Sequence, residues 1–177
     1  MVSWVAWAWQ EAAVRRLTST RLPSGFGFTV VLLCHVAAVL VSVITLVASA
    51  LSAWRLWSAG GVPAPAVRSY FSGGTNWAGR ALWLVPAFGA GLIAMSGGAY
   101  RWSATWVLCG IGLWVGAIAV TEGVLWPAER RVRSVLSEQA SSGGGGAAVA
   151  LARVVCLSAL AALALVLAAT AIMLAKP

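Results

Sequence analysis

The residue of this chain best suited to chemistry is His35, the only histidine in the sequence. It lies in an uncharged run long enough to cross a bilayer, where polar groups are costly and each one is a functional hypothesis. A neutral imidazole is a good ligand for haem iron or copper. It also hydrogen-bonds a backbone carbonyl or a hydroxyl of a neighbouring helix. We therefore keep two interpretations of His35, an axial haem ligand and a polar tie between helices.

A second ligand for such a haem cannot be another histidine of the same chain. The second haem ligand would be a methionine or a group of a partner chain, or the haem would have a single protein ligand. Met95 is predicted to lie within about one to one and a half helical turns of His35 in depth, and His/Met ligation is known in cytochromes. We predict His35 and Met95 as candidate cofactor-binding residues, with His35 as the metal ligand. The adjacent Cys34 points about 100° away on a helix.

Glu122 is the acidic residue that lies within an apolar run, at the opposite end of the membrane from His35. Arg80 precedes another apolar run and is expected at the same end. The two residues predict an intramembrane ion pair, interpreted as a clamp between helices or as part of a proton relay. Elsewhere in the run that holds Glu122, Gly112 and Gly116 form a GxxxG pair, and Gly123 follows. Small residues on one face let helices approach closely, so we predict a packing surface whose partner stays open.

These residues need elements to position them, and composition indicates which. The chain is 61% hydrophobic and 9% charged, whereas soluble domains carry roughly 25% charged residues. Four apolar runs are near the length of roughly 20 residues that a membrane helix needs. The backbone must satisfy its own hydrogen bonds in lipid, so we predict an all-α integral membrane four-helix bundle. The spans are expected near 26–53, 81–99, 102–126 and 154–175.

An even number of spans places both termini on one side of the membrane. We refer to that side as side X, and to the side with the expected loops 54–80 and 127–153 as side Y. Side Y carries more arginines than side X, which favours side Y as the cytoplasmic side. The arginines before the first span argue for the reverse orientation. Residues 1–25 are expected to form a tail or a short interfacial helix. Residues 141–146 have the composition of a flexible Gly/Ser linker.

Charge and residue inventory exclude several classes of function. The net charge is +8, but the arginines are scattered beside apolar runs rather than forming the contiguous basic face that nucleic acid needs. The bilayer is the expected partner, together with other membrane subunits or a second copy. No aspartate is present, so a Ser-His-Asp triad cannot be built.

Three stretches carry a family resemblance: LLCHVAAVL around His35, EGVLWPAERRV from Glu122, and IMLAKP near the C-terminus. The chain resembles small bacterial integral membrane proteins of unknown function. These are related to the copper-resistance D proteins and to the membrane-bound protoporphyrinogen oxidase. The resemblance implies a helical bundle in the bacterial inner membrane with His35 facing its interior. By position it also implies that His35 ligates haem b.

Three functions follow as hypotheses. The first is a small accessory or haem-binding subunit of a membrane electron-transfer assembly. The second is a purely structural packing subunit without a cofactor. The third is a copper-handling membrane protein. Oxidase activity rests on the resemblance alone.

Overall fold

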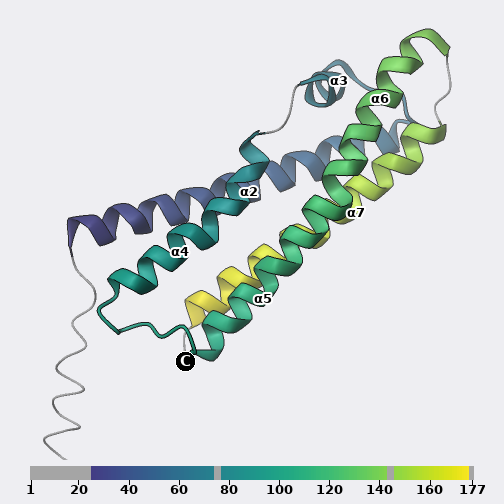
Figure 1. Ribbon diagram of the computed structural model, residues 1–177. Helices are drawn as coiled ribbons and strands as arrows, with labels where there is room; N and C mark the ends of the chain where they lie inside the picture. Colours follow the sequence, from purple (N-terminus) through teal and green to yellow (C-terminus); the bar gives the residue numbers. More distant parts are fainter. Residues whose placement is uncertain (1–24, 74–76, 143–145, 176–177) are drawn as a thin grey trace, which may run out of the picture.

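The computed structural model describes residues 25–73, 77–142 and 146–175, which are helical apart from short connections. Figure 1 shows the arrangement. In chain order the helices are α2 (Phe26–Ser58), α3 (Pro65–Ser72), the 3-10 segment η1 (Trp77–Trp83), α4 (Leu84–Met95), α5 (Thr105–Val120), the π-helical turn η2 (Thr121–Leu125), α6 (Trp126–Ser142) and α7 (Gly146–Ala175). The expected tail at 1–25 falls almost wholly outside the described residues, as does the centre of the linker.

Four helical segments are long and apolar enough to cross a membrane. They are Phe26–Ser58, Ala78–Met95, Thr105–Glu138 and Gly146–Ala175. Helix α2 begins and α7 ends at the same end of the bundle (Figure 1). The prediction of an all-α membrane bundle is therefore confirmed, with the start of α2 and the end of α7 on one side.

Side Y is less loop-rich than the sequence predicts, because the expected loop at 127–153 is largely helical. The apolar stretch does end near Trp126, but the chain continues as helix through Pro127 to Ser142. Proline lacks the N–H that a helix interior needs and its ring crowds the preceding turn. The π-helical turn widens the helix just before it, with the Trp126 N–H donating to the Thr121 carbonyl five residues back.

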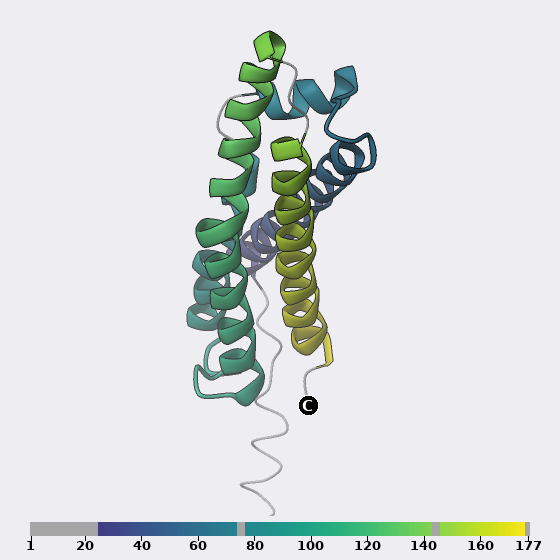
Figure 2. The same cartoon turned by 90° about the vertical axis from the view of Figure 1, so that its right-hand side faces the viewer.

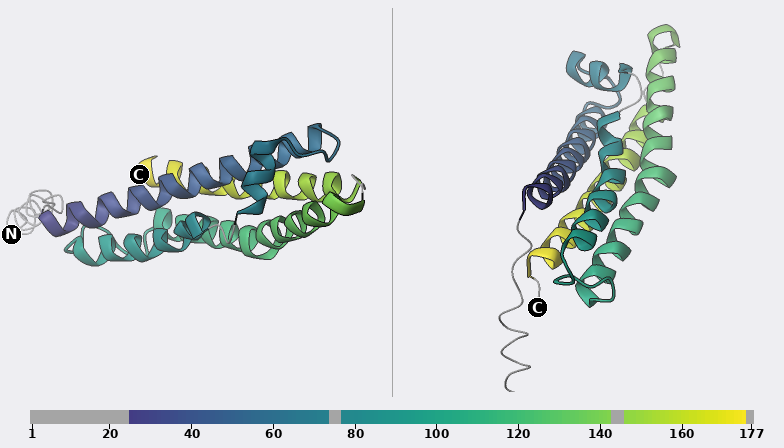
Figure 3. Two further views of the ribbon diagram at one scale, coloured as in Figure 1. Left: turned by 90° about the horizontal axis from the view of Figure 1, so that it is seen from above. Right: turned by 60° about the vertical axis from the view of Figure 1, so that its left-hand side comes forward.

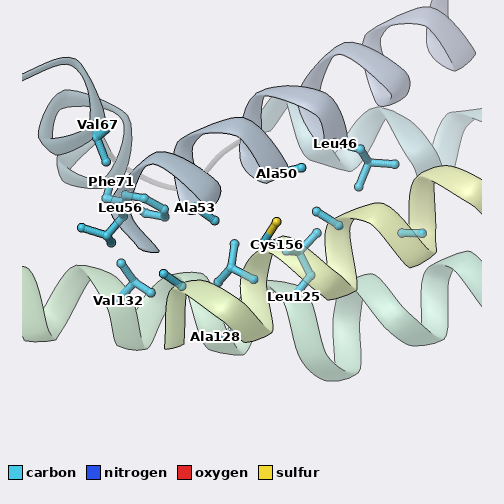
Figure 4. Close-up of a cluster of buried hydrophobic side chains, with 14 of the residues drawn as sticks. Leu46, Ala50, Ala53, Leu56, Val67, Phe71, Leu125, Ala128, Val132 and Cys156 are labelled. Atoms are coloured by element: carbon cyan, nitrogen blue, oxygen red, sulfur yellow. The ribbon is translucent and has the colours of Figure 1, made fainter. Parts of the chain in front are cut away.

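The tightest packing is at the side Y end, where α2, α6 and α7 meet. Figure 2 shows α6 and α7 side by side with α2 crossing behind them. The close-up in Figure 4 shows Leu56, Phe71 and Val132 close together, and Cys156 further along beside Leu125. Helix α7 contributes mainly alanines here, and Ala148, Ala152, Ala159 and Ala162 have no exposed surface. Such small side chains let neighbouring helix backbones approach closely.

Helix α3 lies across the side Y end and contacts both α2 and α6, as the right-hand view of Figure 3 shows. Two glycines with positive φ, Gly60 (64°) and Gly61 (88°), turn the chain out of α2. These left-handed conformations are open to glycine at little cost. Pro65 begins α3, and Val67 and Phe71 bury its apolar face. The short helix thus caps the core from outside.

The side X end is more open. Helix α4 packs on the N-terminal half of α2, while α5 packs on α7. Many large apolar side chains of α2 in this half are exposed: Phe26, Val30, Leu32, Leu33, Val36, Leu40 and Val41. In a bilayer these side chains face lipid, or a partner helix, at no cost of hydration.

Candidate functional site

His35 lies on α2 and faces α4 across a close helix contact. Its Nδ1 is 2.9 Å from the backbone carbonyl oxygen of Val85. The ring occupies space that Gly89 leaves free, because a Cβ built on Gly89 would lie 3.4 Å from His35 Cε1. The imidazole is half-buried. A histidine on one helix and a glycine on the other therefore form a matched contact.

The hydrogen bond to Val85 fixes the tautomer of the neutral imidazole. A carbonyl oxygen can only accept, so Nδ1 must carry the proton. The lone pair of the neutral ring then lies on Nε2. Histidines that ligate metals are commonly oriented in this way, with the other ring nitrogen donating to a backbone carbonyl or a carboxylate. The same bond also satisfies the ring as a simple tie between helices.

Met95, the second predicted ligand, contacts a different level of α2. Its Cε would lie 3.1 Å from a Cβ built on Gly27, and Gly27 precedes His35 by about 12 Å along the helix axis. The offset exceeds the one to one and a half turns expected from the sequence. Cys34 is half-buried. Within residues 25–73, 77–142 and 146–175, no group of three His, Cys, Asp or Glu side chains could hold a metal ion.

The structure gives Glu122 and Arg80 aromatic neighbours. Trp83 Nε1 donates a hydrogen bond of 2.9 Å to Glu122 Oε1, and this bond ties η1 to η2. The Arg80 guanidinium lies over the Trp126 ring, 5.6 Å from its centroid. The ion pair between Glu122 and Arg80 stays a prediction. Glu122 is exposed on the bundle surface, as a carboxylate at a helix junction near the interface would be.

The three glycines of the α5 segment do not share one role. A Cβ built on Gly116 would lie 3.5 Å from Leu165 of α7, whereas Gly112 and Gly123 would meet nothing within 4 Å. Gly116 therefore serves packing inside the chain, between α5 and α7. Gly112 and Gly123 lie at the surface.

Sequence reasoning missed the most buried acidic residue that the structure describes, Glu129 of α6, which is 8% exposed. Its Oε1 accepts hydrogen bonds from the hydroxyls of Ser49 on α2 and Tyr70 on α3. Arg133, one turn further along α6, adds a favourable electrostatic interaction and anchors its Nε on the Phe71 carbonyl at 2.8 Å. A buried carboxylate needs such compensation, and three elements supply it.

Glu129 was missed because the sequence analysis expected a loop after Pro127. A signal was nevertheless present. Leu125, Ala128, Val132 and Leu136 recur at spacings of three and four and are all buried, which is the pattern of a helix face. Glu129, four residues after Leu125, falls on that face. Continuing the helical period through the proline would have found it.

Beside Glu129 lies a small cavity of about 10 Å³, close to what one water molecule occupies. It is bounded by α2, η1, η2 and the start of α6, and its lining is Ser42, Thr45, Leu46, Ser49, Gly79, Leu82, Thr121, Leu125, Trp126 and Glu129. The α2 hydroxyls lie on the same stripe of the helix as His35, which precedes Ser42 by seven residues. One polar stripe of α2 thus carries both His35 and the hydroxyl residues beside the cavity.

Fold and sites together define a small multi-pass helical membrane protein with one oriented imidazole and one buried carboxylate. Comparison with known proteins adds no closer definition: no family model, no curated protein and no solved structure matches the chain.

Proposed function

We propose that this protein is a small subunit of a larger membrane assembly and that His35 is its ligand for haem. The observation that carries the proposal is the hydrogen bond from His35 Nδ1 to the Val85 carbonyl. It leaves Nε2 with the lone pair that iron binds. The family resemblance adds haem b as the expected group. We further propose a bacterial inner membrane location with side Y in the cytoplasm.

The role as a subunit is supported by the exposed surface of the side X half of α2. Large apolar side chains there are exposed, for example Leu33 at 63% and Leu40 at 56%. At about 100° per residue, these two side chains lie on the face of α2 turned away from His35, so they offer a surface to a partner helix or a second copy. Met95 or a group of that partner would be the second haem ligand.

One alternative has an observation in its favour. The bond to Val85 uses the one N–H of the neutral His35 ring and ties α2 to α4, as a packing subunit without a cofactor would require. Copper handling rests on the resemblance, and Cys34 and His35 are its candidate ligands.

The test separates a ligand from a tie by replacing His35 with asparagine. The side-chain amide can still donate to the Val85 carbonyl but has no Nε2. The protein is purified from cells supplied with haem, reduced with dithionite, and its optical spectrum recorded. We expect a Soret band and an α band in the natural protein and their loss in His35→Asn, with the melting temperature little changed.

A natural protein without haem bands overturns the haem proposal, and so do bands that His35→Asn retains. Purification of the natural protein in mild detergent as a lone monomer, with no other chain bound, overturns the proposed role as a subunit.

A further inference from the structure

A second site lies at the other end of the α2 polar stripe, independent of the proposed haem ligand. Four hydroxyl groups and one carboxylate line the cavity beside Glu129: Ser42, Thr45, Ser49, Thr121 and Glu129. A cavity of this size with polar groups in its wall can hold one water molecule. The chemical class of its occupant follows from which hydrogen bonds these groups donate and accept.

Each hydroxyl has already committed its one proton. Ser42 donates to the Ala38 carbonyl at 2.7 Å, Thr45 donates to the Val41 carbonyl at 2.9 Å, and Thr121 donates to the Ala117 carbonyl at 3.0 Å. Ser49 donates to Glu129. A hydroxyl whose proton is used can offer only lone pairs. The hydroxyl lining therefore consists of acceptors.

The carboxylate adds negative charge to this set of acceptors. Both described hydrogen bonds to Glu129 end on Oε1, from Ser49 and Tyr70. In the described part of the chain no side chain or backbone group donates to Oε2. Thr45 and Ser49, four residues apart, are neighbours on one face of α2. Glu129, Ser49 and Thr45 thus form a continuous group of oxygens beside the cavity.

Positive charge stands near this group but outside it. Arg133 interacts with Glu129 from one turn along α6 and fixes its Nε on the Phe71 carbonyl of α3. Arg80 of η1 lies against the Trp126 ring. Neither arginine lines the cavity. Of the two, Arg133 acts on Glu129 and offsets part of its negative charge.

We propose that this cavity is a binding site for one small hard cation, either Na⁺ or a proton, held by Glu129 with the hydroxyl oxygens of Ser49 and Thr45. Oxygen donors are the ligands that hard cations prefer. The cavity volume of about 10 Å³ suits an occupant the size of one water molecule. The site lies between α2, η1, η2 and the start of α6.

The test uses the full chain in detergent and the variant Glu129→Gln, whose amide oxygen can still accept from Ser49 and Tyr70. The matched control is Glu122→Gln, which removes the exposed carboxylate that bonds Trp83. In the first arm, NaCl replaces choline chloride at constant ionic strength and the melting temperature is measured. In the second arm, infrared difference spectra record the carboxyl band across the pH range in which the protein stays folded.

If the ion is Na⁺, the melting temperature rises with Na⁺ in the natural protein and in Glu122→Gln, and the rise is lost in Glu129→Gln. A ligand that binds only the folded state must stabilise it in this way. If the ion is a proton, Na⁺ has no effect, and a carboxyl band that titrates reversibly is lost in Glu129→Gln alone. Absence of both effects, or their persistence in Glu129→Gln, overturns the proposal.

Discussion

At the scale of residues, specific hydrogen bonds hold the side chains of His35 and Glu129 in place. The Val85 carbonyl can only accept, and so it sets the tautomer of His35. Ser49 and Tyr70 supply protons to Glu129. Among the described residues no buried side-chain nitrogen or oxygen lacks a hydrogen-bond partner. The atoms that are still available to bind a ligand are therefore the Nε2 of His35 and the oxygen lone pairs around Glu129.

Removing the Ser49 hydroxyl should destabilise the protein because it takes a donor from a buried carboxylate. Hydrogen bonds to charged groups contribute about 1.5–3 kcal/mol. We expect Ser49→Ala to lower the free energy of unfolding by about that much, measured by denaturant unfolding in detergent. Ser58→Ala is the control, because exposed Ser58 bonds only the Arg55 carbonyl of its own helix. Equal losses in the two variants would contradict the role given to Ser49.

At the scale of elements, glycine and alanine decide how closely the helices approach. Gly89 admits the His35 ring between α4 and α2, and Gly116 admits Leu165 between α5 and α7. The π-helical turn plays a comparable part for α6. It carries the helix past Pro127, so that Glu129 continues on the buried face.

A large side chain at Gly89 should separate α4 from α2. We expect Gly89→Leu to displace the imidazole from the Val85 carbonyl and to cost about 1–3 kcal/mol, as overpacking does. Thermal unfolding followed by tryptophan fluorescence would measure the loss. Gly112→Leu is the matched control, since a Cβ there meets nothing within 4 Å. An equal loss of stability in Gly112→Leu and Gly89→Leu would contradict the role of the Gly89 contact in holding α4 against α2.

The sequence was sufficient to predict the membrane bundle, because length and hydrophobicity alone determine which segments span. It also singled out His35, since a lone imidazole in an apolar run is conspicuous. It did not predict α6, because a proline such as Pro127 usually ends a helix. The π-helical turn that lets the helix continue leaves no simple sequence pattern. Glu129 lies on α6 and was therefore not predicted either. Contacts such as Trp83 with Glu122 depend on how helices rotate against one another, which hydrophobicity does not specify.

At the scale of the whole molecule, the bundle is closely packed toward side Y and open toward side X. The side Y end joins α2, α6 and α7 under the cap of α3, whereas α4 packs on α2 and α5 on α7 at the other end. The proposed cation site lies in the packed end, and His35 lies toward the open end. The exposed side X half is therefore the surface through which the proposed subunit would meet a partner.

The proposed orientation, with side Y in the cytoplasm, predicts which end of the bundle reacts with reagents outside the cell. In a chain whose Cys34, Cys109 and Cys156 are replaced by alanine, we expect Ser103→Cys to react with a membrane-impermeant maleimide in intact bacteria. Ser134→Cys on α6 should react only after lysis, because positively charged segments favour the cytoplasm. The reverse pattern would contradict the orientation, and labelling of both sites from one side would contradict the four-span topology.

The central claim, that His35 ligates haem, is tested most directly by titrating haemin into the purified apoprotein and following the Soret band. We expect a saturable shift of the Soret band in the natural protein and in Glu129→Gln, and no saturable shift in His35→Asn. The same titration curve for His35→Asn and the natural protein would contradict it.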